Sequence, residues 1–239
     1  MSPAWASPER DEMFRLPADA PRVKVCCIAS LDEAKLAADR GATALGLVSE
    51  MPSGPGVIDE DTIAKVARWA PDEVATFLLT SRTDAETIAD QWRRTRVDTL
   101  QLVDRLGPDG LARLRELVPE TSLVQVIHVA GDASIDEAVR VAPLVDAILL
   151  DSGDPNLAVK QLGGTGRTHD WRVSRAIVES VDRPVYLAGG LTPENVGHAL
   201  ATVRPYGVDV CSGLRTHDRL DERLLEPFMD VIASFGDLT

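Results

Sequence analysis

Residues 23–48 read VKVCCIASLDEAKLAADRGATALGLV, and this stretch decides the fold of the chain. Its two apolar runs, Val23–Ile28 and Thr43–Val48, have the length and composition of short buried strands. Between them a helix is predicted over Ser30–Arg40, because this segment begins with a capping-box pattern and is followed by Gly41. The stretch is therefore a strand–helix–strand unit, the building block of a parallel sheet.

The same alternation continues along the rest of the chain. Eight strand–helix units can be counted, and no change of composition separates them, so we predict one domain. Right-handed crossovers would bring the eighth strand beside the first. We therefore predict an α/β fold, a single (β/α)8 TIM barrel over residues 22–239. An open, doubly wound sheet is the alternative. The strands are expected at Val23–Ile28, Thr43–Val48, Val74–Leu79, Asp98–Val103, Leu123–Val129, Asp146–Asp151, Pro184–Ala188 and Val208–Cys211.

Capping patterns predict where two of the later helices begin. Thr83 and Glu86 are spaced as a capping box, and Thr192 followed by Pro193 is typical of an N-cap and a first helical residue. Residues 1–21 lack the apolar core of a signal peptide, so we expect a short N-terminal extension. Docking of this extension on the barrel and disorder are both open.

Composition excludes several classes of function. The chain has 239 residues, 44% of them hydrophobic, and a formal net charge of −13, which disfavours nucleic acid and anionic membranes as partners. No apolar run approaches the ~20 residues of a membrane span. The three cysteines, two of them adjacent, do not form a secreted disulfide framework. We therefore expect a cytoplasmic protein.

Two chemical groups stand at the ends of predicted strands. Cys26 lies near the end of the first strand and Asp151 ends the sixth, at the edge of a barrel where catalytic side chains gather. Strand alternation puts Cys26 on the same face as Lys24 and turns Cys27 toward the helices. Core packing of the thiol and capping of a turn by the carboxylate are the competing explanations.

Three glycine-rich segments are suited to holding a phosphate. Gly189-Gly190 and Ser212-Gly213 follow the seventh and eighth strands, where barrels often bind phosphate through backbone amides and a helix N-terminus. Gly163–Gly166, which contains Gly164 and Gly166, lies farther from its strand. A flap is the alternative for this third segment.

Five motifs occur in order between residues 22 and 236. They are Lys24-Val25-Cys26-Cys27-Ile28, Leu149-Leu150-Asp151-Ser152, Gly163-Gly164-Thr165-Gly166-Arg167-Thr168-His169-Asp170-Trp171, Gly189 to Val196, and Val208-Asp209-Val210-Cys211-Ser212-Gly213. Together they resemble the phosphoribosylanthranilate isomerase family of tryptophan biosynthesis, which is a (β/α)8 barrel enzyme family.

The resemblance implies an Amadori rearrangement, an aldose–ketose isomerisation of a phosphoribosylated amine. Asp151 would be the general acid that opens the furanose ring, and Cys26 the general base that removes the C2 proton. Neither a metal nor an organic cofactor is expected, and the partner would be a small phosphosugar bound by a monomer or homodimer. The implied phosphate- or substrate-binding residues are Lys24, Gln101, Gly164, Gly166, Gly189, Gly190, Asp209, Ser212 and Gly213.

The departures from the family's motifs concentrate on the substrate-facing rim. The family's arginine after strand two, which faces the anthranilate carboxylate, has no counterpart in Met51–Val57. Val103 stands where the family has histidine. Other changed positions are Cys27 for glycine, Cys211 for serine and Arg215 for glutamate. Arginines expected near the rim that could replace the missing one are Arg82, Arg105 and Arg215.

These departures keep two other functions open. One is an isomerase or lyase-like enzyme that uses the same pair on a different phosphosugar, and the other is a non-catalytic phosphosugar-binding barrel. Cys211 is expected near Cys26, where a redox-labile contact is favoured over a thiol metal site with His128 or His217. His169 and His198 are expected at the surface.

Overall fold

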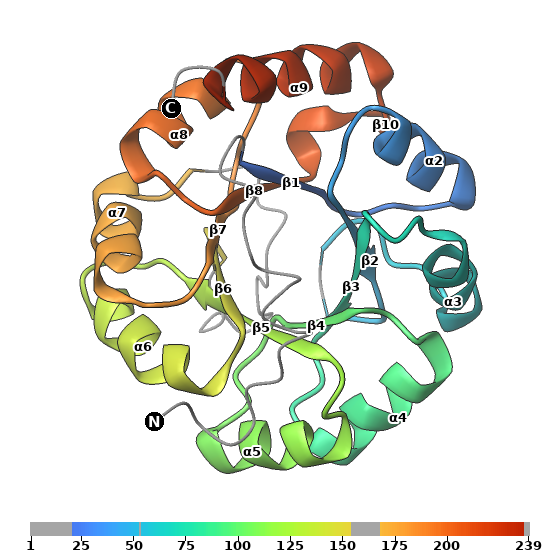
Figure 1. Cartoon of the computed structure of the whole chain (residues 1–239), viewed down its shortest axis with the longest axis vertical. Helices are drawn as coiled ribbons and strands as arrows, with labels where there is room; N and C mark the ends of the chain where they lie inside the picture. The colour runs from blue at the N-terminus through green and yellow to red at the C-terminus, as the bar shows by residue number, and fades with distance from the viewer. Residues whose placement is uncertain (1–20, 53, 154–167, 237–239) are drawn as a thin grey trace.

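The computed structural model describes residues 21–52, 54–153 and 168–236. Eight parallel strands form a closed barrel in which each strand pairs with the next and β8 pairs with β1 (Figure 1). The predicted barrel is confirmed, and the open sheet is wrong. The strands are β1 (Arg22–Val25), β2 (Ala44–Val48), β3 (Ala75–Thr80), β4 (Thr99–Leu102), β5 (Ser122–His128), β6 (Ala147–Asp151), β7 (Val185–Leu187) and β8 (Gly207–Val210).

Helices surround the barrel and cover the outer face of its strands (Figure 1). They are α2 (Leu31–Asp39), α3 (Glu60–Trp69), α4 (Ala85–Thr95), α5 (Pro108–Leu117), α6 (Ala133–Val141), α7 (Trp171–Ser180), α8 (Val196–Val203) and α9 (Glu222–Gly236). Short elements add to them: the 3-10 turns η1 (Ala142–Leu144) and η2 (Ser212–Leu214), and a hairpin of β9 (Arg215–Thr216) and β10 (Arg219–Leu220). Residues 1–20 lie outside the described part, so the N-terminal extension stays a prediction.

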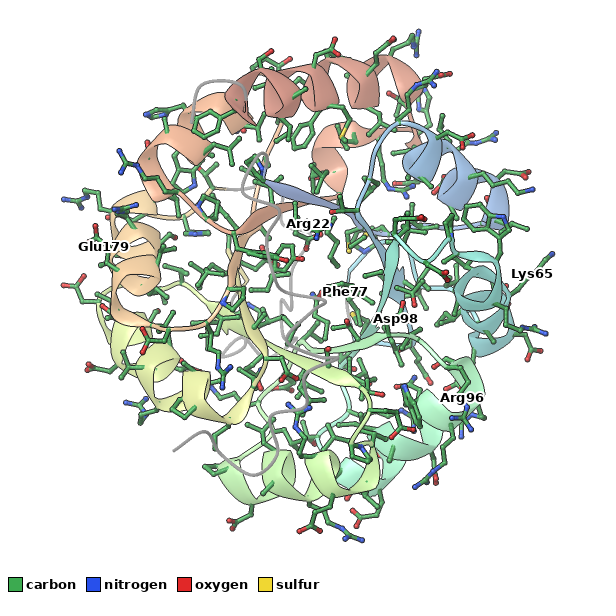
Figure 2. All side chains as sticks on the ribbon, viewed as in Figure 1. Arg22, Lys65, Phe77, Arg96, Asp98 and Glu179 are labelled. Atoms are coloured by element: carbon green, nitrogen blue, oxygen red, sulfur yellow. The ribbon has the colours of Figure 1, made fainter. Side chains whose placement is uncertain are left out.

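Strand alternation divides the buried side chains into two layers. On β5, Leu123 and Ile127 pack toward the helices, whereas Val124 and Val126 belong to a separate cluster that fills the barrel. Phe77 of β3 belongs to the same inner cluster and lies within the ring of strands in Figure 2. The barrel is therefore a packed core whose functional groups must stand at its mouth.

Two helices begin later than their capping patterns predict. Asp84, not Thr83, is the N-cap of α4, and its carboxylate accepts the Thr87 N–H. Aspartate at the adjacent position therefore takes over the role predicted for threonine. α8 begins three residues later than Pro193, with Asn195 as its N-cap.

Two hydrogen bonds of the Asn195 side chain explain the later start of α8. The Thr192 N–H donates to Asn195 Oδ1 at 2.9 Å, and Asn195 Nδ2 donates to the Gly190 carbonyl at 2.9 Å. These bonds fold the segment after Gly190 into a turn before the helix begins. No described helix is long and apolar enough to cross a bilayer.

Candidate active site

The proposed acid–base residues lie at the mouth of the barrel, on the carboxyl side of the strands. Cys26 directly follows β1, and Asp151 is the last residue of β6; their exposed fractions are 5% and 8%. Asp151 shares its strand face with Ala147 and Leu149, which belong to the inner cluster. Its Oδ1 accepts the Ser152 N–H at 2.7 Å.

Beneath Cys26, a buried ion pair spans the seam between the first and last strands. Lys24 and Asp209 are register partners on β1 and β8, and Lys24 Nζ lies 2.8 Å from Asp209 Oδ1. Lys24 is fully buried, with its ammonium 5.5 Å from the centre of the Phe77 ring. Burial disfavours the charge on Lys24, but Asp209 and Cys26 outweigh burial and raise the pKa of Lys24.

Cys27 and Lys24 favour a thiolate at Cys26, while burial and the charge of Asp209 oppose it. A hydrogen bond from Cys27 and the positive charge of Lys24 lower the pKa of Cys26 below its ordinary value, against the opposing effect of burial. Burial raises the pKa of Asp209, and the negative charge of Asp151 acts in the same direction. Cys26, Lys24, Asp209 and Asp151 are thus electrostatically linked in one site.

Cys27 corrects the prediction made from strand alternation. The strand ends at Val25, and Cys27 adopts a φ of +62°, so its side chain joins the inner cluster at the mouth rather than the helix layer. Its thiol is within hydrogen-bonding reach of Cys211 and Cys26, and these contacts raise the pKa of Cys27. Left-handed backbone is the conformation for which glycine is suited.

The loop after β2 closes over Cys27. A Cβ atom added at Gly56 would lie 2.5 Å from the Cys27 Cβ, so the backbone at Gly56 packs directly on the thiol side chain. Gly56 itself has a φ of +77°. The loop after β2 therefore rests on Cys27.

The two glycine segments after β7 and β8 converge as predicted. Gly189 and Gly190 have φ values of +87° and +62°, and a Cβ at Gly213 would overlap the Leu191 carbonyl oxygen. Ser212 is exposed beside this contact. The N-terminus of α8 follows, without a side-chain capping bond among the described residues. This arrangement can present backbone amides and a helix N-terminus to a phosphate.

The structure describes some of the remaining predicted binding residues but not others. Gln101 of β4 is buried, and its Oε1 has no hydrogen-bond partner within the described part of the chain. Lys24 and Asp209 lie below the mouth and form an ion pair with each other. Gly164 and Gly166 fall outside the described residues. A binding role for each of these residues stays a prediction.

Two histidines lie near Asp151, where the sequence analysis did not place them: His128 was considered only as a metal ligand, and His169 was expected at the surface. His128 and Asp151 are register partners, and His128 Nε2 lies 3.0 Å from the carbonyl oxygen of Val103. Its alternation with Val124 was the signal that could have placed it on the inner face. His169 is half-buried rather than on the surface, because its Nε2 contacts Ser174 Oγ at 2.7 Å. Burial lowers the pKa of His169, and the charge of Asp151 opposes this effect.

The three arginines considered as replacements each have a carboxylate partner. Arg105 binds Glu137 through two bonds of 2.7 Å, and Arg82 lies 3.8 Å from Glu60. Arg215 contacts Glu33 at 2.8 Å. To bind a substrate carboxylate, any of these guanidinium groups would have to share or exchange its partner.

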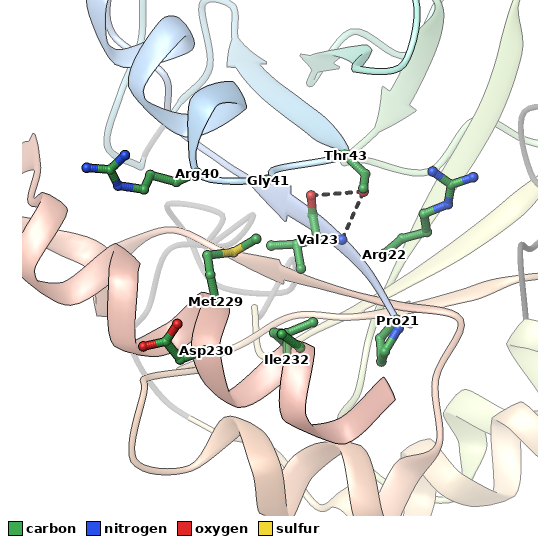
Figure 3. Close-up of a pocket in the computed structure, with 10 residues that line it drawn as sticks. Pro21, Arg22, Val23, Arg40, Gly41, Thr43, Met229, Asp230 and Ile232 are labelled. Atoms are coloured by element: carbon green, nitrogen blue, oxygen red, sulfur yellow. Dashed lines mark hydrogen bonds between the residues drawn. The ribbon is translucent and has the colours of Figure 1, made fainter. Parts of the chain in front are cut away.

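A cavity of about 520 Å³ lies at the opposite end of the barrel (Figure 3). Arg22 and Thr43, at the amino ends of β1 and β2, line it together with Met229 of α9. None of the candidate residues lines this cavity, so the candidate site is the mouth. Within the described residues, no group of His, Cys, Asp or Glu side chains is arranged to hold a metal ion. A thiol metal site with His128 or His217 is therefore not supported.

Comparison with known proteins identifies the family. Residues 23–231 match the family described as N-(5'-phosphoribosyl)anthranilate (PRA) isomerase. The chain belongs to this family. Phosphoribosylanthranilate isomerase 2 of Methanosarcina mazei is 41% identical to it over 81% of this chain and 85% of the relative. The Methanocella arvoryzae isomerase is 36% identical over 88% and 97%.

A solved structure of the family agrees with the fold. The phosphoribosylanthranilate isomerase of Thermotoga maritima superposes with a TM-score of 0.77 at 26% identity, covering 90% of this chain and 98% of that one. The match to the isomerase family therefore rests on sequence and fold together.

Proposed function

We propose that this chain catalyses the Amadori rearrangement of N-(5'-phosphoribosyl)anthranilate. The observation that carries the proposal is that Cys26 and Asp151, which lie about half a chain apart, meet at one barrel mouth above a buried lysine. Membership of the isomerase family supports the same reaction. A thiolate base and a carboxylic acid are the two groups that an aldose–ketose isomerisation requires.

In the proposed mechanism the acid acts first. Asp151 donates a proton to the furanose ring oxygen, the C1–O bond breaks, and the ring opens to a protonated Schiff base. The Cys26 thiolate then removes the proton from C2, and these electrons form the C1–C2 double bond of an enolamine. Tautomerisation of the enolamine gives the aminoketose, and proton return restores both residues.

The phosphate of the substrate is assigned to the cradle formed by Gly189, Gly190, Ser212 and Gly213. A chain of net charge −13 needs a locally positive site for an anion, and backbone amides with a helix N-terminus provide one. The convergence of the two segments, with Gly213 packed on the Leu191 carbonyl, supports this assignment.

A second candidate function has a specific observation in its favour. The loop after β2 carries no arginine, and Arg82, Arg105 and Arg215 are all paired with glutamates. A relative that isomerises the phosphoribosyl derivative of another amine would keep the acid–base pair and the cradle, and would change this part of the rim. A phosphosugar-binding barrel without turnover is the third candidate.

The test is the fluorescence decrease as phosphoribosylanthranilate, made in situ, is consumed by the full chain. Cys26→Ala and Asp151→Asn are each expected to lower kcat/KM by about 10³-fold, because each removes a proton-transfer group. Asp132→Asn, an exposed carboxylate after β5, is the matched control and should retain activity. Folded protein without turnover would contradict the proposal.

Product analogues separate the candidates. Binding of an anthranilate-containing analogue at micromolar strength supports phosphoribosylanthranilate as the substrate. Binding of inorganic phosphate without binding of the analogue supports the derivative of another amine. Stabilisation by phosphosugars without turnover of any of them supports the third. We also propose a cytoplasmic location. The chain is further proposed to be a monomer or a homodimer, and light scattering of the purified chain would distinguish these two states.

A further inference from the structure

All three cysteines of the chain pack together at the barrel mouth. Cys26 and Cys27 follow β1, Cys211 follows β8, and the Cys26 N–H donates to the Val210 carbonyl at 2.8 Å, which holds these two strand ends side by side. Cys26 and Cys27 belong to the same buried cluster inside the barrel mouth, and the Cys211 side chain packs against that cluster. All three are free thiols in the structure.

Two cations flank this group of thiols. Lys24 acts on Cys26 from below, and Arg215 contacts the backbone of Cys27 from the rim. The side chain of Arg215 is only 7% exposed, and its guanidinium donates to the carbonyl oxygen of Cys27. The positive charge of Lys24 favours the thiolate of Cys26 and so increases the reactivity of Cys26 toward oxidants.

The group is also where this chain departs from its family's motifs. The motifs that this chain resembles have glycine, serine and glutamate at positions 27, 211 and 215; here Cys27 and Cys211 pack in one cluster with Cys26, and Arg215 donates to the Cys27 carbonyl oxygen. Cys27 carries a left-handed φ of +62°, a conformation that costs energy in any residue except glycine. A cysteine at this position therefore calls for an explanation beyond packing.

We propose that Cys26, Cys27 and Cys211 form a peroxide-reactive site that returns the Cys26 thiol to its reduced state. Hydrogen peroxide is the oxidant class. The Cys26 thiolate attacks it, the O–O bond breaks, and Cys26 becomes a sulfenic acid while hydroxide leaves and is protonated to water. The Cys27 thiol then attacks the Cys26 sulfur, which forms a Cys26–Cys27 disulfide and releases a second water.

The last step transfers the disulfide away from Cys26. Cys211 attacks the Cys27 sulfur and gives up its proton to water, the Cys26–Cys27 bond breaks, and Cys26 leaves as a thiolate. Its own lowered pKa makes Cys26 a good leaving group. In sum, two thiols and one peroxide give a Cys27–Cys211 disulfide and two waters, and Cys26 is free again. Cys211, the most exposed of the three, is then open to an external reducing thiol.

Peptide mapping tests this site without relying on activity. The full chain is treated with equimolar hydrogen peroxide, alkylated and mapped under non-reducing conditions. The expected product joins the peptide of Cys26 and Cys27 to that of Cys211, with fragment ions placing the alkyl group on Cys26. A Cys26–Cys211 disulfide, a stable sulfinic acid at Cys26, or unmodified thiols would each overturn the proposal.

Cys211→Ser and Cys27→Gly restore the residues of the family motif and are therefore suitable variants. In Cys211→Ser, oxidation should stop at the Cys26–Cys27 disulfide, and in Cys27→Gly at the sulfenic or sulfinic acid of Cys26. If the isomerase assignment holds, peroxide should lower the activity of Cys211→Ser about tenfold more than that of the unchanged chain. An inactive but correctly mapped chain would contradict the proposed isomerase activity and leave the thiol chemistry supported.

Discussion

At the scale of single residues, the reactivity of Cys26 is set by its two nearest polar neighbours. The hydrogen bond from Cys27 is the largest contribution to its lowered pKa, and the charge of Lys24 adds to it. Burial alone would push the thiol toward its neutral form. The base of the proposed reaction is therefore prepared by the adjacent residue in the chain.

Replacing Cys27 by glycine is expected to raise the pKa of Cys26, because it removes the hydrogen-bond donor while suiting the local backbone. The measurement is the pH dependence of Cys26 alkylation, followed by mass spectrometry of the full chain. The acid limb of kcat/KM against pH should move in parallel to higher pH. Cys211→Ser is the control, and an unshifted alkylation profile in Cys27→Gly would refute the role of Cys27.

At the scale of elements, Glu33 joins α2 to the hairpin of β9 and β10. Its carboxylate accepts the Ala29 N–H at 3.0 Å and the Leu220 N–H at 3.0 Å, and it pairs with Arg215 at 2.8 Å. Burial raises the pKa of Glu33, but Arg215 and the two amides outweigh burial, and the net direction is downward. These contacts thereby hold the loop after β8 beside the three cysteines Cys26, Cys27 and Cys211.

Glu33→Gln should lower the free energy of unfolding by about 2 kcal/mol at pH 7, because charge-assisted hydrogen bonds are lost. The folded pKa is depressed, so this stabilisation is present above the unfolded value of about 4.3 and is lost as the pH falls through the folded value. Urea denaturation of both proteins from pH 7 downward measures the difference. If the difference in unfolding free energy between the two proteins stayed constant as the pH falls, the stabilisation would not come from the ionised Glu33 carboxylate.

The control for this comparison is Glu86→Gln. Glu86 also pairs with an arginine, Arg113, but both side chains are about half exposed. Exposed pairs contribute little, so no measurable change is expected.

At the scale of the whole molecule, the barrel closes where Lys24 faces Asp209. The two residues are register partners across the seam of β1 and β8, and both are buried. Removing one partner of a buried pair leaves an uncompensated charge, whereas replacing both by apolar residues does not. Closure of the barrel therefore depends on the pair as a unit.

Lys24→Met should destabilise the fold by about 3–5 kcal/mol, and the double variant Lys24→Met with Asp209→Leu should recover much of this loss. Denaturant unfolding followed by circular dichroism measures both. Burial already raises the pKa of Asp209, so the single variant should be least stable at neutral pH and gain as Asp209 is protonated. A double variant as unstable as the single one would show that the ion pair is not what joins the seam.

The overall architecture was accessible from sequence because it depends on repeated patterns. Alternating apolar runs and helices predicted the eight units and the closure of β8 on β1, and both are confirmed. The face of Cys27 was not accessible, since alternation holds only while a strand continues and β1 ends at Val25. The carboxylate partners of Arg105 and Arg215 come from distant segments, which no local pattern reports. The chemical roles of Cys26 and Asp151 stay predictions.

The packing of Gly56 on Cys27 constrains the evolutionary history of this rim. With a cysteine at 27, a side chain at 56 would meet the Cys27 Cβ at 2.5 Å, so the loop after β2 cannot change freely while that cysteine is present. Glycine at position 27 would not relieve this contact, because the backbone Cα of residue 27 lies 2.9 Å from the same Cβ position and Gly56 itself has a φ of +77°. Position 56 is therefore restricted to glycine as long as this backbone is kept, and a larger side chain in the loop after β2 has to stand at a neighbouring residue.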